Sequence, residues 1–441
     1  MADGWDLPHP PVVITLKGGD KLSKIIKAKY NSEAVAGFTH RTALEEAARC
    51  LLCHDAPCSQ GCPAGTDPAK FIRSIRFRNV KGAAETIRQN NVMGGTCARI
   101  CPYDRLCEEA CSRCGIDKPI QIGKLQRYAI EQEKLFGMKT LEAPKEKRKA
   151  KVACVGAGPA SLAVAAELAK AGVNVTVFER EAKAGGACSY GIIPHRLPQS
   201  VVDWDVKQVK DLGVKFKFNH VAVNSDLEPF DAVFVGAGLW GGNKPAIEGA
   251  NLKGVYSAID FLKEARTKKT AFEPGRRVIV VGGGDTAVDC AVTAKLLGAE
   301  DVRILYRRTI EEAPASIDEF HYLLSMGIGI TTGLAPVAAK GSKKITTLEA
   351  KGFYDKKARM SMSCDCLVFA TGQKAEDLTG ITPMELNDNG TIKVKKDGSA
   401  RDKYFAAGDV VNGGKTVVEA VAAGKEAAES ILKFLDKKGV K

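Results

Sequence analysis

Nine of the fourteen cysteines lie within one stretch of 65 residues, and this crowding constrains the fold more than any other feature of the sequence. They are Cys50, Cys53, Cys58, Cys62, Cys97, Cys101, Cys107, Cys111 and Cys114. The first four follow the pattern C-x2-C-x4-C-x3-C-P, and the second run reads C-P-x4-C-x3-C. Compact cysteine runs that a distant cysteine completes are typical of iron–sulfur clusters. Two runs therefore predict two clusters.

Zinc is the alternative metal, because it also favours four thiolate ligands. Zinc modules usually pair two C-x2-C knuckles, whereas this stretch has one such pair followed by longer and irregular gaps. The spacing therefore favours iron–sulfur clusters over zinc. Disulfides are not expected, because we predict a cytoplasmic location where thiols stay reduced.

The charge of the chain is uneven. Lys and Arg outnumber Asp and Glu by 65 to 52, and residues 1–150 carry +8 of the formal net charge of +13. Part of this excess is interpreted as compensation for buried anionic clusters. The basic stretch 143–151 is short, mixed in sign and without aromatic residues, so no nucleic-acid partner is expected. No apolar run approaches the roughly 18 residues of a membrane helix, and the first residues lack the pattern of a secretory signal, so no membrane partner is expected either.

The periodicity of the sequence changes after residue 151. Residues 42–136 have a helical pattern broken by the cysteine loops, and a charged linker follows. Residues 152–155, 160–171 and 173–178 then read as strand, helix and strand, and the same pattern returns at 278–306. Two such units at this separation predict two mononucleotide-binding folds of the Rossmann type.

The first glycine turn has the context of a dinucleotide site, because it follows a strand and opens a helix. Gly156 permits the tight turn, and Gly158 lets the backbone approach a pyrophosphate at the helix N-terminus. Ala160 follows, and Ser161 replaces the third glycine with another small residue. Glu179 ends the next strand, where a carboxylate can accept both ribose hydroxyls. An exposed acid at the strand end is the alternative interpretation of Glu179.

The second glycine turn differs from the first in the strand that follows it. The turn and the start of its helix contain Gly282, Gly283, Gly284, Asp285, Thr286 and Ala287. The strand that follows ends in Arg307 and Arg308 instead of an acid, and guanidinium groups bind the 2′-phosphate of NADP through charge-assisted hydrogen bonds. We therefore predict NADPH over NADH. The alternative is an arginine that faces solvent beside Glu311 and Glu312.

The segments 49–63, 94–111 and 120–126 resemble the amino-terminal iron–sulfur domain of dihydropyrimidine dehydrogenase. From about residue 40 the chain is most similar to the FAD-containing small subunit of the bacterial enzyme, and more distantly to the small subunit of glutamate synthase. The resemblance implies a helical [4Fe-4S] domain (1–148), an FAD domain in two parts (149–244 and 374–441), and an NADPH domain inserted between them (245–373).

The resemblance also assigns cluster ligands. The first cluster would take Cys50, Cys53, Cys58 and Cys111. The second would take Cys62, Cys101, Cys107 and the side-chain oxygen of Gln126. Without the resemblance, Gln126 reads as a surface helix residue. The remaining cysteines are predicted to be small buried apolar residues.

Three further segments resemble the FAD contacts of this flavoprotein class. They contain Gly185, Gly186, Gly408, Asp409 and Thr416. The resemblance implies that Asp409 faces the ribityl chain and that the helix beginning at Thr416 points at the flavin. Without it, Asp409 would be an ordinary acid in a turn.

The implied activity is electron input. Electrons would pass from NADPH through FAD and two [4Fe-4S] clusters to a separate FMN-containing catalytic subunit, which would reduce uracil or thymine. Hydride transfer between the two cofactors needs little side-chain chemistry, so no catalytic acid or base is predicted. One alternative is the small subunit of glutamate synthase or of an electron-bifurcating NADPH:ferredoxin oxidoreductase. Another is a redox-sensing or scaffold protein without turnover.

Overall fold

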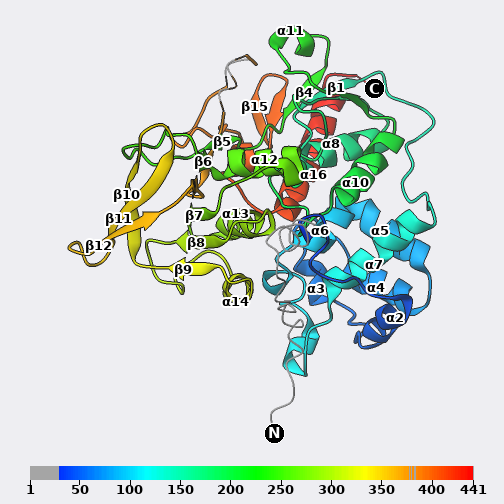
Figure 1. Cartoon of the computed structure of the whole chain (residues 1–441). Coiled ribbons are helices and arrows are strands. Elements are labelled where there is room, and N and C mark those ends of the chain that lie inside the picture. Colours follow the sequence, from blue (N-terminus) through cyan, green and yellow to red (C-terminus); the bar gives the residue numbers. More distant parts are fainter. Residues whose placement is uncertain (1–28, 377, 379, 382–383, 441) are drawn as a thin grey trace. The chain divides into compact units, whose positions relative to one another are not determined.

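The computed structural model describes residues 29–376, 378, 380–381 and 384–440, and these residues form two compact units (Figure 1). One unit comprises Ala34–Ser189, Arg196–Trp240 and the residues after Gln373. It holds the cysteine-rich segment and the first glycine turn. The other comprises Gly241–Gln373 with residues 29–33 and Tyr190–His195, and it holds the second glycine turn.

The cysteine-rich segment is helical. Its elements are α2 (His40–Ala48), α3 (Pro57–Gln60), α4 (Pro68–Arg76), α5 (Val80–Asn90), α6 (Gly94–Ile100) and α7 (Ile122–Leu135), with the 3-10 turns η1 (Tyr103–Arg105) and η2 (Ser112–Gly115). Thr39, Asp67 and Asn79 begin α2, α4 and α5 by accepting the backbone N–H three residues further on. Phe71 and Leu125 are fully buried in the core that these helices share.

A six-stranded sheet follows in the same unit, with the strand order β15-β16-β4-β1-β2-β3. The strands are β1 (Lys151–Val155), β2 (Asn174–Phe178), β3 (Lys215–Lys217), β4 (Ala232–Val235), β15 (Ser399–Arg401) and β16 (Tyr404–Ala406). All neighbours are parallel except β15 and β16. Because β16 pairs with β4, the chain returns to this sheet after the inserted segment 241–373. The discontinuous domain expected from the sequence is confirmed.

Six helices belong to this part of the chain, namely α8 (Pro159–Lys170), α9 (Ala187–Tyr190), α10 (Gln199–Asp211), α11 (Asn224–Leu227), α15 (Asp409–Asn412) and α16 (Val417–Lys437). Of these, α8 and α16 pack on the strands, and α10 and α16 contact α6 of the cysteine-rich part. The long helix α16 packs closely on α8, and α10 packs on α6. The α16–α8 crossing requires a glycine, because a Cβ on Gly424 would lie 2.4 Å from the carbonyl oxygen of Ala160.

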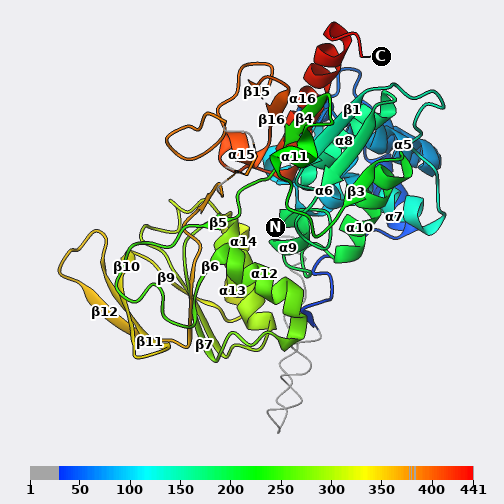
Figure 2. The ribbon, with the colours of Figure 1, turned by 90° about the horizontal axis from the view of Figure 1, so that it is seen from above.

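The second unit contains a parallel sheet between two covering layers (Figure 2). The parallel strands, in the order β6-β13-β7-β8-β9, are β6 (Val255–Ser257), β13 (Cys366–Phe369), β7 (Arg277–Val281), β8 (Asp301–Leu305) and β9 (Gly329–Thr331). One covering layer consists of the helices α12 (Ala258–Lys268), α13 (Asp285–Leu296) and α14 (Ile317–Ser325), with the turn η3 (Lys269–Ala271). The other consists of the antiparallel strands β10 (Leu334–Gly341), β11 (Ile345–Gly352) and β12 (Arg359–Ser363). The short strands β5 (Gly241–Gly242) and β14 (Gln373–Lys374) lie where the chain enters and leaves this unit.

The chain thus has the architecture that its sequence predicts, a helical domain followed by two Rossmann-like domains, one inserted into the other. The boundaries at 148, 244 and 373 stay a prediction, because the iron–sulfur and flavin-type segments belong to one compact unit. Among the described residues, no helix is long and apolar enough to cross a bilayer. The cytoplasmic location also stays a prediction.

Candidate functional site

Four cysteines from two segments line one cavity in the helical domain. Cys50, Cys53 and Cys58 come from the segment between α2 and the end of α3, and Cys111 immediately precedes η2. The space among these side chains, its opening to solvent included, is about 360 Å³. Its other walls are Leu51, Ala56, Pro57, Ala69, Ile72, Ser112, Arg113, Ile120 and Ile122. These four thiols are the set that the resemblance assigns to the first cluster.

Burial makes the thiols of Cys50 and Cys58 hard to ionise on their own. It raises the pKa of Cys50, and it raises the pKa of Cys58 to about 11, with further contributions from the neighbouring thiols of the same set. Thiolates gathered in such a place need a cationic group that compensates their charge. Across the described part of the chain, no three His, Cys, Asp or Glu side chains are arranged to hold a single metal ion. The four thiols instead surround a space, and a soft sulfur donor set around a space of this kind fits a polynuclear iron–sulfur group.

A second group of cysteines lies beside the first. The short helix α3 joins the two, because Cys58 is on it and Cys62 follows it. Cys101 ends α6 as its C-cap. A hydrogen bond with Cys97, burial, and the charges of Cys107 and Cys62 together raise the pKa of Cys101. Burial, with a contribution from Cys62, raises the pKa of Cys107 to about 12. Cys62, Cys101 and Cys107 therefore lie within electrostatic reach of one another.

Gln126 is buried on α7, not exposed as the residues alone predict. Its Nε2 donates a hydrogen bond of 2.8 Å to the carbonyl oxygen of Gly94, the first residue of α6. This is the one hydrogen bond that the described residues make to the Gln126 side chain. The amide nitrogen is therefore fixed, and Oε1 is left available as a ligand oxygen.

The remaining cysteines differ among themselves. Five of them are buried as predicted, namely Cys154, Cys188, Cys290, Cys364 and Cys366. Cys97 is also buried, but it lies against Cys101 and not among apolar side chains alone. The prediction is wrong for Cys114, which is exposed because η2 is a surface turn, and its Sγ lies 3.3 Å from the carbonyl oxygen of Glu108.

A lysine from the flavin-type domain contacts the loop after Cys62. Lys425 on α16 donates a hydrogen bond of 2.6 Å from Nζ to the carbonyl oxygen of Ala64. Burial lowers the pKa of Lys425, while Glu167 and Cys62 act in the opposite direction. One positive charge therefore lies beside the second cysteine group and belongs to a helix of the flavin-type domain.

The first glycine turn has the geometry of a dinucleotide loop. Gly156 has a φ of +87°, and a Cβ there would lie 2.7 Å from the carbonyl oxygen of Gly236. Gly158 is the N-cap of α8 and makes no side-chain cap. A Cβ on Gly158 would have its nearest neighbour 3.9 Å away, so the space above the first turn of α8 is open. Ala160 and Ser161 are buried in that turn.

Glu179 is buried at the end of β2 and faces this loop. Its Oε2 accepts a hydrogen bond of 2.7 Å from the backbone N–H of Ala157, and its Oε1 accepts one of 2.9 Å from Glu181. Burial raises the pKa of Glu179, and these two backbone donors oppose the shift. The interpretation as an exposed strand-end acid is therefore wrong, because Glu179 is buried and the backbone of Ala157 and Glu181 donates to its carboxylate.

Three segments that are far apart in the sequence meet at this loop. Gly186 has a φ of +53°, and a Cβ there would lie 2.9 Å from the Cα of Gly158. Gly408 has a φ of +78°, and a Cβ there would lie 2.9 Å from the Cβ of Ala160. Gly185, with a φ of +113°, continues the same turn as Gly186. The backbone thus forms a cradle that side chains at these positions would fill.

Asp409 and Thr416 belong to the two helices that follow Gly408. Asp409 is the first residue of α15, burial raises its pKa, and its Oδ1 accepts a hydrogen bond of 3.1 Å from the backbone of Lys415. Thr416 is the N-cap of α16 and forms a capping box with Glu419. The positive N-terminal end of α16, a helix of 21 residues, therefore lies at Thr416.

The second glycine turn is in the inserted unit. Gly282 has a φ of +147°, and a Cβ there would lie 2.4 Å from the carbonyl oxygen of Ala370. Gly284 is the N-cap of α13. Asp285, Thr286 and Ala287 form the first turn of that helix.

The arginine pair follows β8 in the same unit. Arg307 is exposed, and its guanidinium carbon lies 5.6 Å from the ring centroid of Phe353. Arg308 is half-buried. Glu312 accepts hydrogen bonds from Tyr354 Oη and from the backbone of Thr309, and these donors, with the charge of Arg308, lower its pKa. Glu312 is thus hydrogen-bonded to Tyr354 and Thr309. The guanidinium of Arg307 lies over the Phe353 ring.

Sequence reasoning missed a group of buried charges. Arg88, Glu133 and Asp205 are almost completely buried, and Arg88 forms an ion pair with each of the two acids. They come from α5, α7 and α10, so the helical and flavin-type domains share the cluster. In the sequence each is one charged residue in an amphipathic helix, and no local signal separates it from an exposed charge.

Two family descriptions match the chain. Dihydropyrimidine dehydrogenase domain II, 4Fe-4S cluster, matches residues 27–137. Pyridine nucleotide-disulphide oxidoreductase matches residues 150–424. The first match contains all the proposed cluster ligands, and the second contains both glycine turns.

Curated relatives match over nearly the whole chain. The NAD-dependent dihydropyrimidine dehydrogenase subunit PreT of Escherichia coli (strain K12) is 43% identical over 413 residues, covering 92% of this chain and 98% of PreT. PreT of Salmonella typhimurium is 41% identical over 415 residues with the same coverage. The glutamate synthase [NADPH] small chain of Escherichia coli (strain K12) is 30% identical over 453 residues, covering 94% of this chain and 95% of that protein.

Solved structures share the fold at lower identity. FprA of Mycobacterium tuberculosis in complex with NADPH has a TM-score of 0.57 and 18% identity, covering 66% of this chain and 86% of FprA. Thioredoxin reductase of Lactococcus lactis has a TM-score of 0.54 and 20% identity, covering 66% of this chain and all of that one.

The sequence matches and the geometry lead to the same class of enzyme. The chain is an NAD(P)H-dependent oxidoreductase with FAD and 4Fe-4S iron–sulfur groups. The PreT relatives align with 92% of this chain. The chain therefore belongs to the family of dihydropyrimidine dehydrogenase subunits that PreT represents.

Proposed function

We propose that this chain is the electron-input subunit of a dihydropyrimidine dehydrogenase. It would take electrons from NADPH and deliver them, through FAD and two [4Fe-4S] clusters, to a partner subunit that carries FMN and reduces uracil or thymine. The observation that carries the proposal is the cavity lined by Cys50, Cys53, Cys58 and Cys111, which lies in the same unit as the first glycine turn.

The two cysteine groups would hold the clusters. Cys50, Cys53, Cys58 and Cys111 would bind the first, and Cys62, Cys101, Cys107 and Gln126 the second. The shared helix α3 supports electron transfer between them, because one turn of backbone separates a ligand of each cluster. Replacing a thiolate by the neutral Gln126 amide makes the second cluster about one charge less negative, which favours its reduction.

The first glycine turn would hold FAD. Gly156, Gly158, Ala160 and Ser161 would approach the pyrophosphate, with Glu179 on the ribose hydroxyls. Each oxygen of the Glu179 carboxylate accepts one backbone hydrogen bond and would accept a ribose hydroxyl with its second lone pair. Gly185, Gly186 and Gly408 keep the cradle open, Asp409 would face the ribityl chain, and α16 would direct its N-terminal end from Thr416 at the flavin.

The second glycine turn would hold the nicotinamide nucleotide. Its residues Gly282, Gly284, Asp285, Thr286 and Ala287 would bind the pyrophosphate at the N-terminus of α13. When bound, the nucleotide and FAD supply the hydride chemistry and the clusters supply single-electron transfer. The protein residues bind and orient these groups, and no side chain is required as an acid or base.

We further propose a preference for NADPH, supported by Arg307 and Arg308 at the end of β8. The PreT relatives are named NAD-dependent, whereas the similar glutamate synthase chain is named for NADPH. This chain would therefore differ from PreT in the nucleotide that it prefers. The test is kcat/KM for both nucleotides with an artificial electron acceptor. Arg307→Ala should raise the KM for NADPH and leave the KM for NADH unchanged, and a wild-type preference for NADH would refute the proposal.

The partner subunit can be tested directly. The purified chain, mixed with an FMN-containing dihydropyrimidine dehydrogenase subunit, should oxidise NADPH in a reaction that depends on uracil. The alternative partner is a glutamate synthase large subunit, which the 30% identity over 94% of this chain supports. Glutamate production with that partner, and no uracil-dependent reaction with the first, would decide for the alternative.

A further inference from the structure

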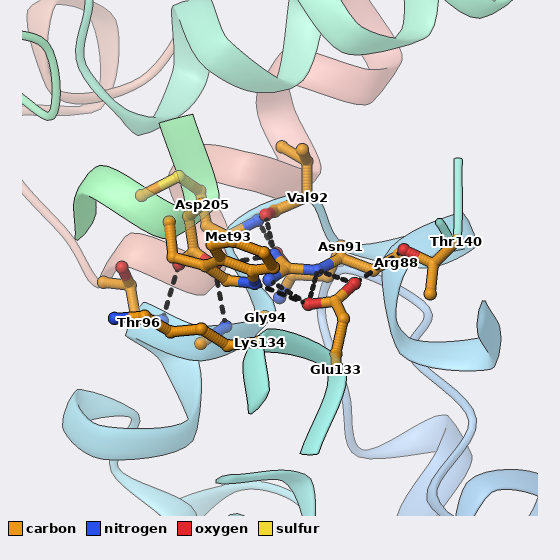
Figure 3. A network of polar contacts seen from close by, with 12 residues as sticks. Arg88, Asn91, Val92, Met93, Gly94, Thr96, Glu133, Lys134, Thr140 and Asp205 are labelled. Atoms are coloured by element: carbon orange, nitrogen blue, oxygen red, sulfur yellow. Dashed lines mark hydrogen bonds and ion pairs between the residues drawn. The ribbon is translucent and has the colours of Figure 1, made fainter. Parts of the chain in front are cut away.

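A buried polar network joins the helical domain to the flavin-type domain (Figure 3). Arg88 on α5 lies between two carboxylates. Its Nη1 donates to Asp205 Oδ1 at 2.6 Å, and its Nε and Nη2 donate to Glu133 at 2.7 to 3.1 Å. Trp204 and Thr140 also donate to Glu133, at 2.9 and 2.6 Å. The side chains of all three charged residues are inaccessible to solvent.

Asp205 supplies the N-terminal cap that α6 lacks. Met93, at the N-cap position of α6, makes no side-chain hydrogen bond to the helix. Asp205 on α10 takes this place from another domain. Its Oδ2 accepts a hydrogen bond of 2.7 Å from the backbone N–H of Thr96, and its Oδ1 accepts one of 3.2 Å from Gly95 (Figure 3). Free backbone donors at a helix start need such an acceptor when they are buried.

Helix α6 in turn positions two of the proposed ligands of the second cluster. Its first residue, Gly94, accepts the hydrogen bond that orients the Gln126 amide, and Cys101 is its C-cap. Because α6 has only seven residues, a shift at its start moves both ends. The carboxylate of Asp205 therefore connects the flavin-type domain to both of these residues.

We propose that Asp205 is a positioning residue for the second iron–sulfur cluster. Held by Arg88, it fixes α6 and thereby the places of Gln126 and Cys101 around the cluster. The inference rests on the proposed second cluster and adds a residue that contacts neither the iron nor the ligand side chains. Asp205 has no such link to the first cluster, whose ligands Cys50, Cys53, Cys58 and Cys111 lie outside α6.

The test is Asp205→Asn in the full-length holoprotein. The amide NH2 group would face either the backbone N–H donors of α6 or Arg88, and none of these can accept its hydrogen bond. At least one contact of Asp205 is therefore lost, while the side chain keeps its size. Iron content and the EPR spectra of the reduced protein are measured during a potentiometric titration. Cys62→Ser identifies the signal of the second cluster by removing it. The matched control is Asp203→Asn, which removes the same charge from an exposed position on α10.

We expect altered g values and a shifted midpoint potential for the second cluster alone, or a loss of half the iron with the first signal intact. Eight irons with both signals unchanged in Asp205→Asn would overturn the inference. Changes in both signals, or equal changes in Asp203→Asn, would overturn it as well. A wild-type protein with one cluster would instead refute the proposed second cluster, so the two failures are distinct.

Gly95→Ala provides a second perturbation that leaves every charge in place. A Cβ on Gly95 would lie 2.8 Å from Asp205 Oδ1, so the carboxylate must move away from α6. The same selective change in the second cluster is expected. If Asp205→Asn does not fold, this variant decides alone, and an unchanged second signal in folded Gly95→Ala would overturn the inference.

Discussion

Replacing Arg88 by Met is expected to destabilise the unit that contains the helical and flavin-type domains. The guanidinium donates to both oxygens of Glu133, to Asp205 and to the carbonyl oxygen of Val92. Although burial acts against the charged form, the two carboxylates raise the pKa of Arg88. Methionine has a similar apolar stem and removes every one of these donors.

The expected cost follows from the charges left behind. The wild-type cluster of one arginine and two acids carries a net charge of −1, and Arg88→Met leaves −2 in a place without solvent. Removing one partner of a buried ion pair costs about 3–5 kcal/mol. Glu133→Gln breaks the same pair but leaves Arg88 and Asp205 as a neutral pair. It should cost less, about 1–2 kcal/mol, because the amide oxygen remains an acceptor.

The assay is urea unfolding of the holoprotein followed by tryptophan fluorescence. Trp204 reports on this region, because its Nε1 donates to Glu133 at 2.9 Å. Arg148→Met is the control, since Arg148 forms a partly exposed ion pair with Asp436, at 2.8 Å, that should contribute less than about 1 kcal/mol. The reasoning is refuted if Arg88→Met costs less than about 1 kcal/mol, or if Glu133→Gln costs as much as Arg88→Met.

Three further predictions concern the cofactor sites. Gly424→Ala should lower the denaturation midpoint and FAD retention, although alanine favours a helix by about 1 kcal/mol, because its Cβ would clash with Ala160. A midpoint above that of the wild type would contradict this. Phe353→Leu removes the ring beneath Arg307 and should raise the KM for NADPH about two- to fivefold. An equal rise for NADH would argue against a role in 2′-phosphate binding. Lys425→Met should lower the potential of the second cluster by on the order of tens of millivolts, and an unchanged or higher potential in a redox titration would count against it.

Features set by short stretches of chain were predictable from the sequence. A glycine turn between a strand and a helix is local, so Gly156 and Gly282 could be assigned from their neighbours. The same holds for the cysteines in the run from Cys50 to Cys62. The closing cysteine, Cys111, could be added through the resemblance, because its place beside Cys50 depends on how the intervening helices pack.

Features set by long-range packing could not be predicted. Gln126 is buried because the carbonyl of Gly94, 32 residues away, accepts its amide. Arg88 is buried because its partners Glu133 and Asp205 come from positions 45 and 117 residues further on. Each of these polar side chains has the local sequence of an exposed helix residue. Their burial depends on a partner whose place the tertiary fold alone determines.

The central claim is that two separate ligand sets hold two clusters that accept electrons from NADPH through FAD. Anaerobic titration of the holoprotein with NADPH, followed by absorbance and EPR, tests it most directly. We predict about eight irons per FAD, bleaching of the flavin and two cluster signals, of which Cys53→Ser removes one and Cys62→Ser the other. A protein that contains zinc instead of iron, or that loses the same single signal in both variants, would contradict the claim.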